Sequence, residues 1–251
     1  MPQPRHAAAE FGEELRGLRR EDGARLEQLL WLLDNQRRKL PDDPETVSAH
    51  NYALVLAGRA EAARAEALHL HRLLTPESRS QDLLHTVVAL IDAGLCLPAQ
   101  QRIDELRRRA LSHVESERLQ AYATTLAARF GEVAWYRQRF SPTPVITLIE
   151  RTGDLRFWLA QQQGIEQAIG LRVADMTCKA LVDPEGAGAR VCLDYFTDAG
   201  TVAEVEALLN AAIDAAMAAY ADHPDGPGAF VGRVVIEVHG PEIPPFRELP
   251  R

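Results

Sequence analysis

Polar residues that alternate with apolar ones near the end of the chain are the best placed to do chemistry. Residues 172–182, 190–197 and 233–239 show this alternation, which predicts strands with one polar and one apolar face. With the apolar side chains packed under helices, the opposite face of the sheet carries Asp175, Thr177, Lys179, Arg190, Cys192, Asp194, Glu237 and His239. Carboxylates and a histidine on one face can hold a divalent metal or supply an acid–base pair, and the candidates are Asp175, Asp194, Glu237 and His239. A merely solvated face is the alternative, because alternating charge is also what solvation requires.

The three cysteines, Cys96, Cys178 and Cys192, form no CxxC pair. Their odd number, without a recognisable secretion signal, predicts reduced thiols, and it excludes a zinc site built from cysteine pairs. Cys178 shares a face with Met176, whereas Cys192 shares a face with Asp194, so the two thiols face opposite sides unless the register slips by one residue. The motifs GxxxxGK[ST], GxGxxG, GxSxG and HExxH do not occur. The sequence therefore predicts no cofactor and no catalytic residue.

The elements that must position the polar face follow a change of periodicity after residue 140. The predicted order is strand, helix, strand, strand, helix, strand, which matches a βαββαβ ferredoxin-like sandwich with two helices on one sheet face. The expected elements are strands at Val145–Glu150, Arg172–Val182, Arg190–Thr197 and Arg233–His239, and helices at Leu155–Ile169 and Val202–Ala221. A β-hairpin over residues 145–159, turning at Gly153, is the competing interpretation of the first part.

Four glycines recur along the first half of the chain at nearly even intervals. Gly23, Gly58, Gly94 and Gly131 are separated by 35, 36 and 37 residues, and each precedes a helix-like apolar pattern. Periods of this size are typical of stacked helix hairpins, because one hairpin cannot bury its apolar stripe alone. A compact bundle of helices without repeats is the alternative.

Residues 44–76 resemble a tetratricopeptide repeat. In that family a glycine separates the two helices, a small residue lies five positions later and a proline closes the unit, and Gly58, Ala63 and Pro76 match these positions. Gly94 and Ala99 match in the next unit, although the closing proline is absent. The resemblance covers about 130 residues, but the spacing exceeds the family's usual period of about 34 residues. The pattern therefore indicates an irregular repeat.

The resemblance implies a groove that binds a peptide or helix of another protein. The first helix of each hairpin would line that groove, and the candidate side chains are His50, Tyr52, His85, Arg118 and Tyr122. The lysine-rich clamp for carboxylates that some members of the family use is excluded, because Lys39 is the only lysine of the array.

The net charge of −8 lies entirely in the C-terminal part. Residues 1–140 carry 20 basic and 20 acidic residues, whereas residues 141–251 carry 8 and 16. An acidic C-terminal part argues against nucleic acid as its partner, since phosphate would be repelled. We find no apolar stretch long enough to cross a membrane and no signal-like N-terminus, so the expected location is the cytoplasm.

Together these patterns predict the class α+β, with an N-terminal α-solenoid of helix hairpins followed by a small ferredoxin-like sandwich. The expected parts are a disordered N-terminus at 1–8, a tetratricopeptide-like array at 9–140, the sandwich at 141–240 and a proline-rich tail at 241–251. We expect a non-catalytic adaptor whose partner is a protein or peptide, with no metal, nucleic acid or membrane involved. An enzyme or a ligand-binding module that uses the polar sheet face is the alternative, and a homodimer through that face also stays open.

Overall fold

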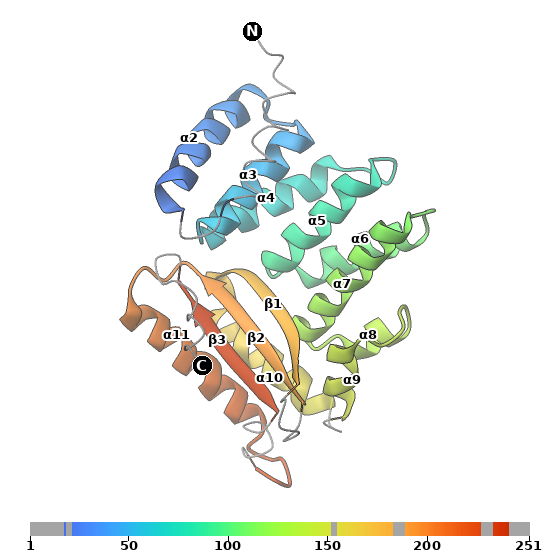
Figure 1. The fold of residues 1–251 in the computed structure, drawn as a ribbon, viewed down its shortest axis with the longest axis vertical. Coiled ribbons are helices and arrows are strands. Elements are labelled where there is room, and N and C mark those ends of the chain that lie inside the picture. The colour runs from blue at the N-terminus through green and yellow to red at the C-terminus, as the bar shows by residue number, and fades with distance from the viewer. Residues whose placement is uncertain (1–17, 19–21, 152–154, 183–188, 227–232, 241–251) are drawn as a thin grey trace.

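The computed structural model describes residues 18, 22–151, 155–182, 189–226 and 233–240. Helices form most of this part, and a small mixed sheet lies near its C-terminal end, which confirms the α+β class. Figure 1 shows the helices from α2 to α9 as an arc that runs along one side of the sheet. The predicted disordered N-terminus, the proline-rich tail and most of the first predicted helix lie outside the described residues. No helix in the described ranges has the length and apolarity that crossing a bilayer requires.

The N-terminal helices form antiparallel pairs. Helices α3 and α4 pack against each other, as do α5 and α6, while α3 also contacts α5, and α5 contacts α7. The first helices of successive pairs therefore lie next to one another in one layer. The bounds are α2 Gly23–Lys39, α3 Pro44–Leu56, α4 Ala60–Leu73, α5 Ser80–Asp92, α6 Cys96–Arg107, α7 His113–Phe130 and α8 Val133–Arg137.

Three of the four regularly spaced glycines make the turns within these pairs. Gly58, Gly94 and Gly131 follow the ends of α3, α5 and α7, and their φ angles of 68°, 70° and 72° are left-handed. Such angles favour glycine, which has no Cβ to clash. Gly23 differs, because it is the first residue of α2 and has no positive φ. Gly23 therefore begins a helix and does not form a turn between two helices, although it fits the regular spacing.

Local capping explains where several helices begin. The Asp43 carboxylate accepts a hydrogen bond from the Thr46 amide, and Pro44 occupies the first turn of α3, where its missing N–H costs nothing. Helix α7 begins with a reciprocal capping box between Ser112 and Glu115. Short-range hydrogen bonds thus stop the chain from extending one helix into the next.

The segment predicted as the first strand of the sandwich is a helix. Residues Pro144–Arg151 form α9, and Val145, Ile146 and Ile149 are buried on one side of it. This spacing fits a helical period, and the β-branched residues that suggested a strand are compatible with a short buried helix. The predicted βαββαβ order and the alternative hairpin over 145–159 are therefore both wrong.

The remaining elements of the C-terminal part agree with the predicted order. The three strands lie in the order β1-β2-β3, with β1 antiparallel to β2 and β2 parallel to β3. Helix α11 makes the crossover between the parallel strands. The bounds are α10 Leu155–Ile169, the short 3-10 helix η1 Gly170–Arg172, β1 Val173–Val182, β2 Ala189–Thr197, α11 Val202–Ala219 and β3 Val234–His239.

Helices α10 and α11 pack against each other and cover one face of the sheet. Leu193 and Tyr195 of β2 are buried on this face, and the Tyr195 hydroxyl donates a hydrogen bond to Gln162 of α10. The β1 edge of the sheet contacts α4, α5, α7 and α9. The helical arc therefore covers a strand edge that would otherwise expose unpaired backbone groups.

Within the described ranges, the larger of two hydrophobic clusters runs from the helical arc into the sheet, while the smaller one lies among α2, α3 and α4. The larger cluster includes Val47 of α3, Leu126 of α7 and Leu193 of β2. At the junction, the fully buried Arg129 guanidinium donates hydrogen bonds to the carbonyls of Ile91 (2.7 Å) and Asp92 (3.1 Å). The same guanidinium forms an ion pair of 3.3 Å with Glu166 of α10, so Arg129 joins α5, α7 and α10.

Two of the turn glycines lie directly against α10. A Cβ at Gly94 would lie 2.6 Å from the Glu166 carboxylate, and one at Gly131 would lie 2.8 Å from the Leu159 Cα atom. The array thus meets the C-terminal part through its turns. Glycine is required at each of these positions for two reasons, which are the left-handed backbone angle and the close approach of α10.

Candidate functional site

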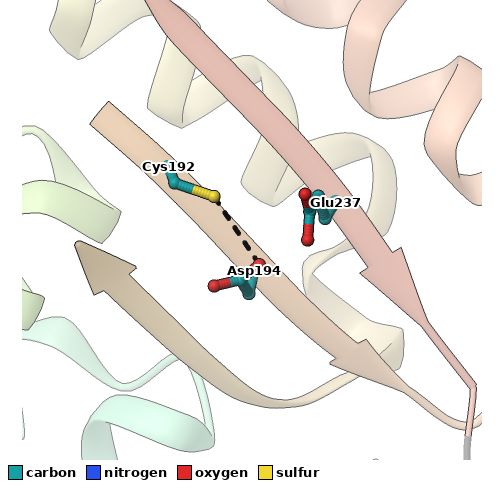
Figure 2. Close-up of side chains that lie close together, drawn as sticks. All are labelled: Cys192, Asp194 and Glu237. Atoms are coloured by element: carbon teal, nitrogen blue, oxygen red, sulfur yellow. Dashed lines mark hydrogen bonds between the residues drawn. The ribbon is translucent and has the colours of Figure 1, made fainter. Parts of the chain in front are cut away.

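The outer face of the sheet, opposite α10 and α11, brings polar side chains of three strands together. In the register of the strands, Asp194 pairs with Thr177 on one side and with Glu237 on the other. Cys192 pairs with Lys179, and Phe196 of β2 pairs with His239 of β3. Paired residues point to the same face of a sheet. Figure 2 shows Cys192 and Asp194 on β2 directed toward the same space as Glu237 on β3.

Asp194 is the centre of this cluster and is only 5% exposed. Its Oδ2 atom accepts a hydrogen bond of 3.0 Å from the Thr177 hydroxyl and lies 3.2 Å from the Lys179 ammonium. Its Oδ1 atom lies 3.6 Å from the Cys192 Sγ atom and 3.6 Å from the His239 Nε2 atom. The two oxygens therefore have different surroundings: the Thr177 hydroxyl and the Lys179 ammonium lie at Oδ2, and the Cys192 thiol and the His239 imidazole lie at Oδ1.

His239 connects the two carboxylates. Its Nε2 atom lies 3.6 Å from the Glu237 Oε2 atom as well as 3.6 Å from Asp194. The imidazole is more than nine-tenths buried and stacks on the Phe196 ring at 4.9 Å between centroids. The ring is thus held in place by packing while its nitrogen is directed between two acidic groups.

Burial and mutual contact shift the pKa values of the cluster in opposite directions. Burial alone raises the pKa of Asp194, but contacts with His239, Glu237 and Lys179 outweigh it and hold that pKa well below its usual range. The pKa of Glu237 is raised, first by burial and then by the neighbouring Asp194. Two carboxylates this close do not ionise independently, so the cluster favours a proton or another cation between them.

None of the cysteine thiols is activated as a nucleophile. Burial raises the pKa of Cys192 to about 12, with a further contribution from Asp194. Burial likewise raises the pKa of Cys178 and of Cys96 to about 12. Cys178 pairs with Leu193 and Cys192 pairs with Lys179, which puts the two thiols on opposite faces of the sheet. All three cysteines are free, as the sequence predicts.

Within the described residues, the ligand atoms of Cys192, Asp194 and Glu237 lie within 4.8 Å of one another. Of the four residues that the sequence singled out on this face, the structure brings Asp194, Glu237 and His239 together. Asp175 lies on the same face, opposite Phe196, but its carboxylate is not part of the group. Cys192 was placed on the face but not named as a ligand, although its position two residues before Asp194 was a usable signal.

The five residues predicted to line a peptide groove have different environments. His50 does not lie on an open surface, because its Nδ1 atom is 2.9 Å from Glu66 of α4 and its Nε2 atom is 3.1 Å from Asp34 of α2. Its position on α3 directs it between two neighbouring helices, where contacts within the protein hold it. Tyr52 is 41% exposed, and His85 and Arg118 are exposed too. Tyr122 is half-buried, and burial raises its pKa.

Tyr52, His85 and Arg118 share one side of the helix layer. They precede the turn glycines of α3, α5 and α7 by six, nine and thirteen residues. These positions differ by three and four residues, which is the spacing of one face of a helix. Because the glycine turns align the helices, the three side chains point to the same side of the layer at different heights.

A shallow hollow of about 440 Å³ lies near the second helices of the array, lined by Asp104, Arg107, Arg108, Gln138 and Arg139. Arg139 forms a two-point ion pair with Asp104 at 2.7 and 3.1 Å. Arg107 lies over the Phe140 ring and 3.8 Å from Asp104. Much of the positive charge around this hollow is thus held by contacts within the protein.

Comparison with family models, with curated proteins and with solved structures finds no match to this chain. The resemblance to tetratricopeptide repeats therefore rests on the residues themselves, and the functional argument rests on the geometry of the two surfaces.

Proposed function

We propose that the protein is a non-catalytic adaptor whose irregular, solenoid-like array of helix hairpins binds a peptide segment of a partner protein. The observation that carries this proposal is the alignment of α3, α5 and α7 in one layer, each ended by a left-handed glycine. Repetition of this kind creates an extended surface that suits a linear ligand better than a small molecule. We call the surface formed by Tyr52, His85, Val88, Arg118 and Tyr122 the first-helix face.

The side chains of the first-helix face have the composition of a binding surface. Tyrosine and arginine are enriched in protein interfaces, because each combines a large contact area with hydrogen bonding. Arg118 carries a permanent positive charge, whereas Tyr52, Val88 and Tyr122 offer apolar area. We therefore expect a peptide that has a carboxylate near Arg118 and apolar side chains along the tyrosines.

The C-terminal part supports the array without covering this face. Helix α10 packs against the turns at Gly94 and Gly131, while Tyr52, His85 and Arg118 keep their exposure. A support at the turns fixes the angle between successive hairpins, which reduces the entropy that a partner would otherwise have to remove on binding.

The test compares two triple variants of the full chain. One carries Tyr52→Ala, His85→Ala and Arg118→Ala on the first-helix face, and the control carries Glu61→Ala, Arg72→Ala and Gln101→Ala at exposed positions of α4 and α6. Both variants and the wild type are cross-linked in the native host and purified, and the captured proteins are quantified by mass spectrometry.

We expect at least one protein to be captured by the wild type and by the control but reduced at least about tenfold in the face variant, since one interface hot spot is worth more than about 1.4 kcal/mol. Peptides tiled from that protein are then titrated against the purified chain by calorimetry. Equal capture by both variants, or a captured protein none of whose peptides binds, overturns the proposal.

A further inference from the structure

The ligand atoms of Cys192, Asp194 and Glu237 lie within 4.8 Å of one another on the outer face of the sheet. The Cys192 thiol donates a hydrogen bond of 3.6 Å to the Asp194 Oδ1 atom, so these two ligand atoms already lie side by side. Zinc–ligand bonds of about 2.0–2.3 Å give a tetrahedron whose edges are about 3.3–3.6 Å.

His239 lies beside this group. It is more than nine-tenths buried, and its Nε2 atom pairs with both carboxylates at 3.6 Å. Stacking on Phe196 holds the ring in this position. The imidazole therefore helps to hold the two carboxylates in place.

The surroundings of Asp194 resemble the outer contacts that orient metal ligands. The Thr177 hydroxyl donates a hydrogen bond to Oδ2, whereas Oδ1 faces Cys192 and His239. Ligating carboxylates in proteins are commonly fixed by such hydrogen bonds to the oxygen that does not bind the metal. Lys179 also balances part of the negative charge, but at 54% side-chain exposure its ammonium can move toward water.

We propose that Cys192, Asp194 and Glu237 form a binding site for a divalent transition metal of the zinc class. A set of sulfur and oxygen ligands selects zinc or cobalt over magnesium and calcium, which prefer oxygen alone. Binding converts the Cys192 thiol and the M²⁺ ion into a metal thiolate and releases one proton, with no change of oxidation state. This site lies apart from the first-helix face and does not depend on the adaptor proposal.

The test uses cobalt, whose bond to a thiolate gives a charge-transfer absorption band in the near ultraviolet. The full chain is purified, treated with a chelator and titrated with Co²⁺, and zinc is then added as a competitor. We expect a thiolate band that saturates near one equivalent of cobalt and is abolished by zinc. The absence of this band overturns the proposal.

Variants of the two sheet cysteines identify the ligand. Cys192→Ser removes the band, whereas Cys178→Ser leaves it unchanged, because Cys178 lies on the opposite face of the same sheet. A band that survives Cys192→Ser, or one that is lost in Cys178→Ser alone, contradicts the assignment. Circular dichroism of each variant shows that the fold is kept.

Two further variants cover the case in which Cys192→Ser does not fold. Glu237→Gln changes a side chain that is 48% exposed, and it should weaken cobalt binding at least about tenfold. Thr177→Val removes the hydrogen bond to Oδ2 of Asp194 and should weaken binding about 10–100-fold. Affinities that equal the wild type in both variants overturn the proposal.

Discussion

The helical array and the sheet each place a carboxylate beside a histidine and a basic residue, but the spacing differs. In the array, the Glu66 carboxylate lies 2.6 Å from the Arg37 Nε atom and 2.9 Å from the His50 Nδ1 atom. In the sheet, Asp194 lies 3.6 Å from both His239 and Cys192. The first cluster is closed by short contacts between charged groups, whereas in the second the contacts of the thiol and the imidazole with the carboxylate are longer.

The comparison teaches that distance, rather than residue type, separates a structural cluster from a candidate ligand site. Both nitrogens of His50 are engaged, one by Glu66 and the other by Asp34. A metal could bind there only by breaking the ion pairs that already engage both nitrogens of His50 and the Glu66 carboxylate. At Asp194 a second carboxylate, Glu237, adds negative charge that Lys179 does not fully balance.

The largest effect is expected for Glu66→Leu, which leaves Arg37 and His50 without their shared acceptor. Breaking a buried or half-buried ion pair from one side costs about 2–4 kcal/mol, because the remaining charge stays poorly solvated. The free energy of unfolding, measured in urea, should fall by that amount. Glu61→Leu, at an exposed position of the same helix, is the control, and an equal loss in both variants would show that Glu66 has no special role.

The same carboxylate gives the stability a pH dependence. Burial opposes ionisation of Glu66, but His50 and Arg37 lower its pKa from the usual 4.5 to about 2. A depressed folded-state pKa contributes stability above the unfolded pKa, and that stability is lost as the pH falls through the folded pKa. At about 1.4 kcal/mol per pKa unit, the wild type should exceed Glu66→Gln by about 3 kcal/mol at neutral pH. Urea unfolding between pH 5 and 2 should show this gap closing, and a constant gap contradicts the assignment.

Asp194→Asn in metal-free protein should cost less, about 1–2 kcal/mol, because the lost contact with Lys179 is offset by relief of the repulsion between Asp194 and Glu237. Zinc at a hundred times its dissociation constant should then stabilise the wild type by about 2.7 kcal/mol and leave the variant unchanged. Thermal unfolding with and without zinc measures both effects. A loss as large as that of Glu66→Leu would remove the contrast between the two clusters.

Lys179→Met should have the smallest effect on stability, below about 1 kcal/mol, because exposed ion pairs contribute little. Its effect on metal binding has the opposite sign to that of a ligand variant, because it removes a cation that competes for Asp194. We expect cobalt affinity to rise several-fold in the titration described above. A fall in affinity would mean that Lys179 orients the carboxylate rather than competing for it.

Features set by local sequence were predictable in both regions. The turns at Gly58, Gly94 and Gly131 follow from neighbouring apolar patterns, since a left-handed residue after a helix depends on only a few residues. The strands expected at 172–182 and 190–197 are found at Val173–Val182 and Ala189–Thr197, because alternation is a local signal.

Features set by distant contacts were not predictable. Residues 145–150 fit a strand or a buried helix equally well, and only packing against α7 and the sheet decides for the helix. His50 was assigned to an open groove because the sequence does not show that Asp34 and Glu66 approach it from two other helices. The approach of Glu237 to Cys192 depends on the parallel pairing of β2 with β3, which α11 sets across many residues.

Because one hydrophobic cluster joins the helical array to the sheet, we expect the two surfaces to unfold together. Trp158 of α10 donates a hydrogen bond to the Ala128 carbonyl of α7, and Arg129 spans the same junction, so severing the chain near residue 141 would divide one folding unit. A peptide bound to the helices and a metal ion bound to the strands would each lower the population of unfolded chain, because each binds only the folded protein. Occupancy of either surface would therefore protect the other from proteolysis, even with no change of shape between them.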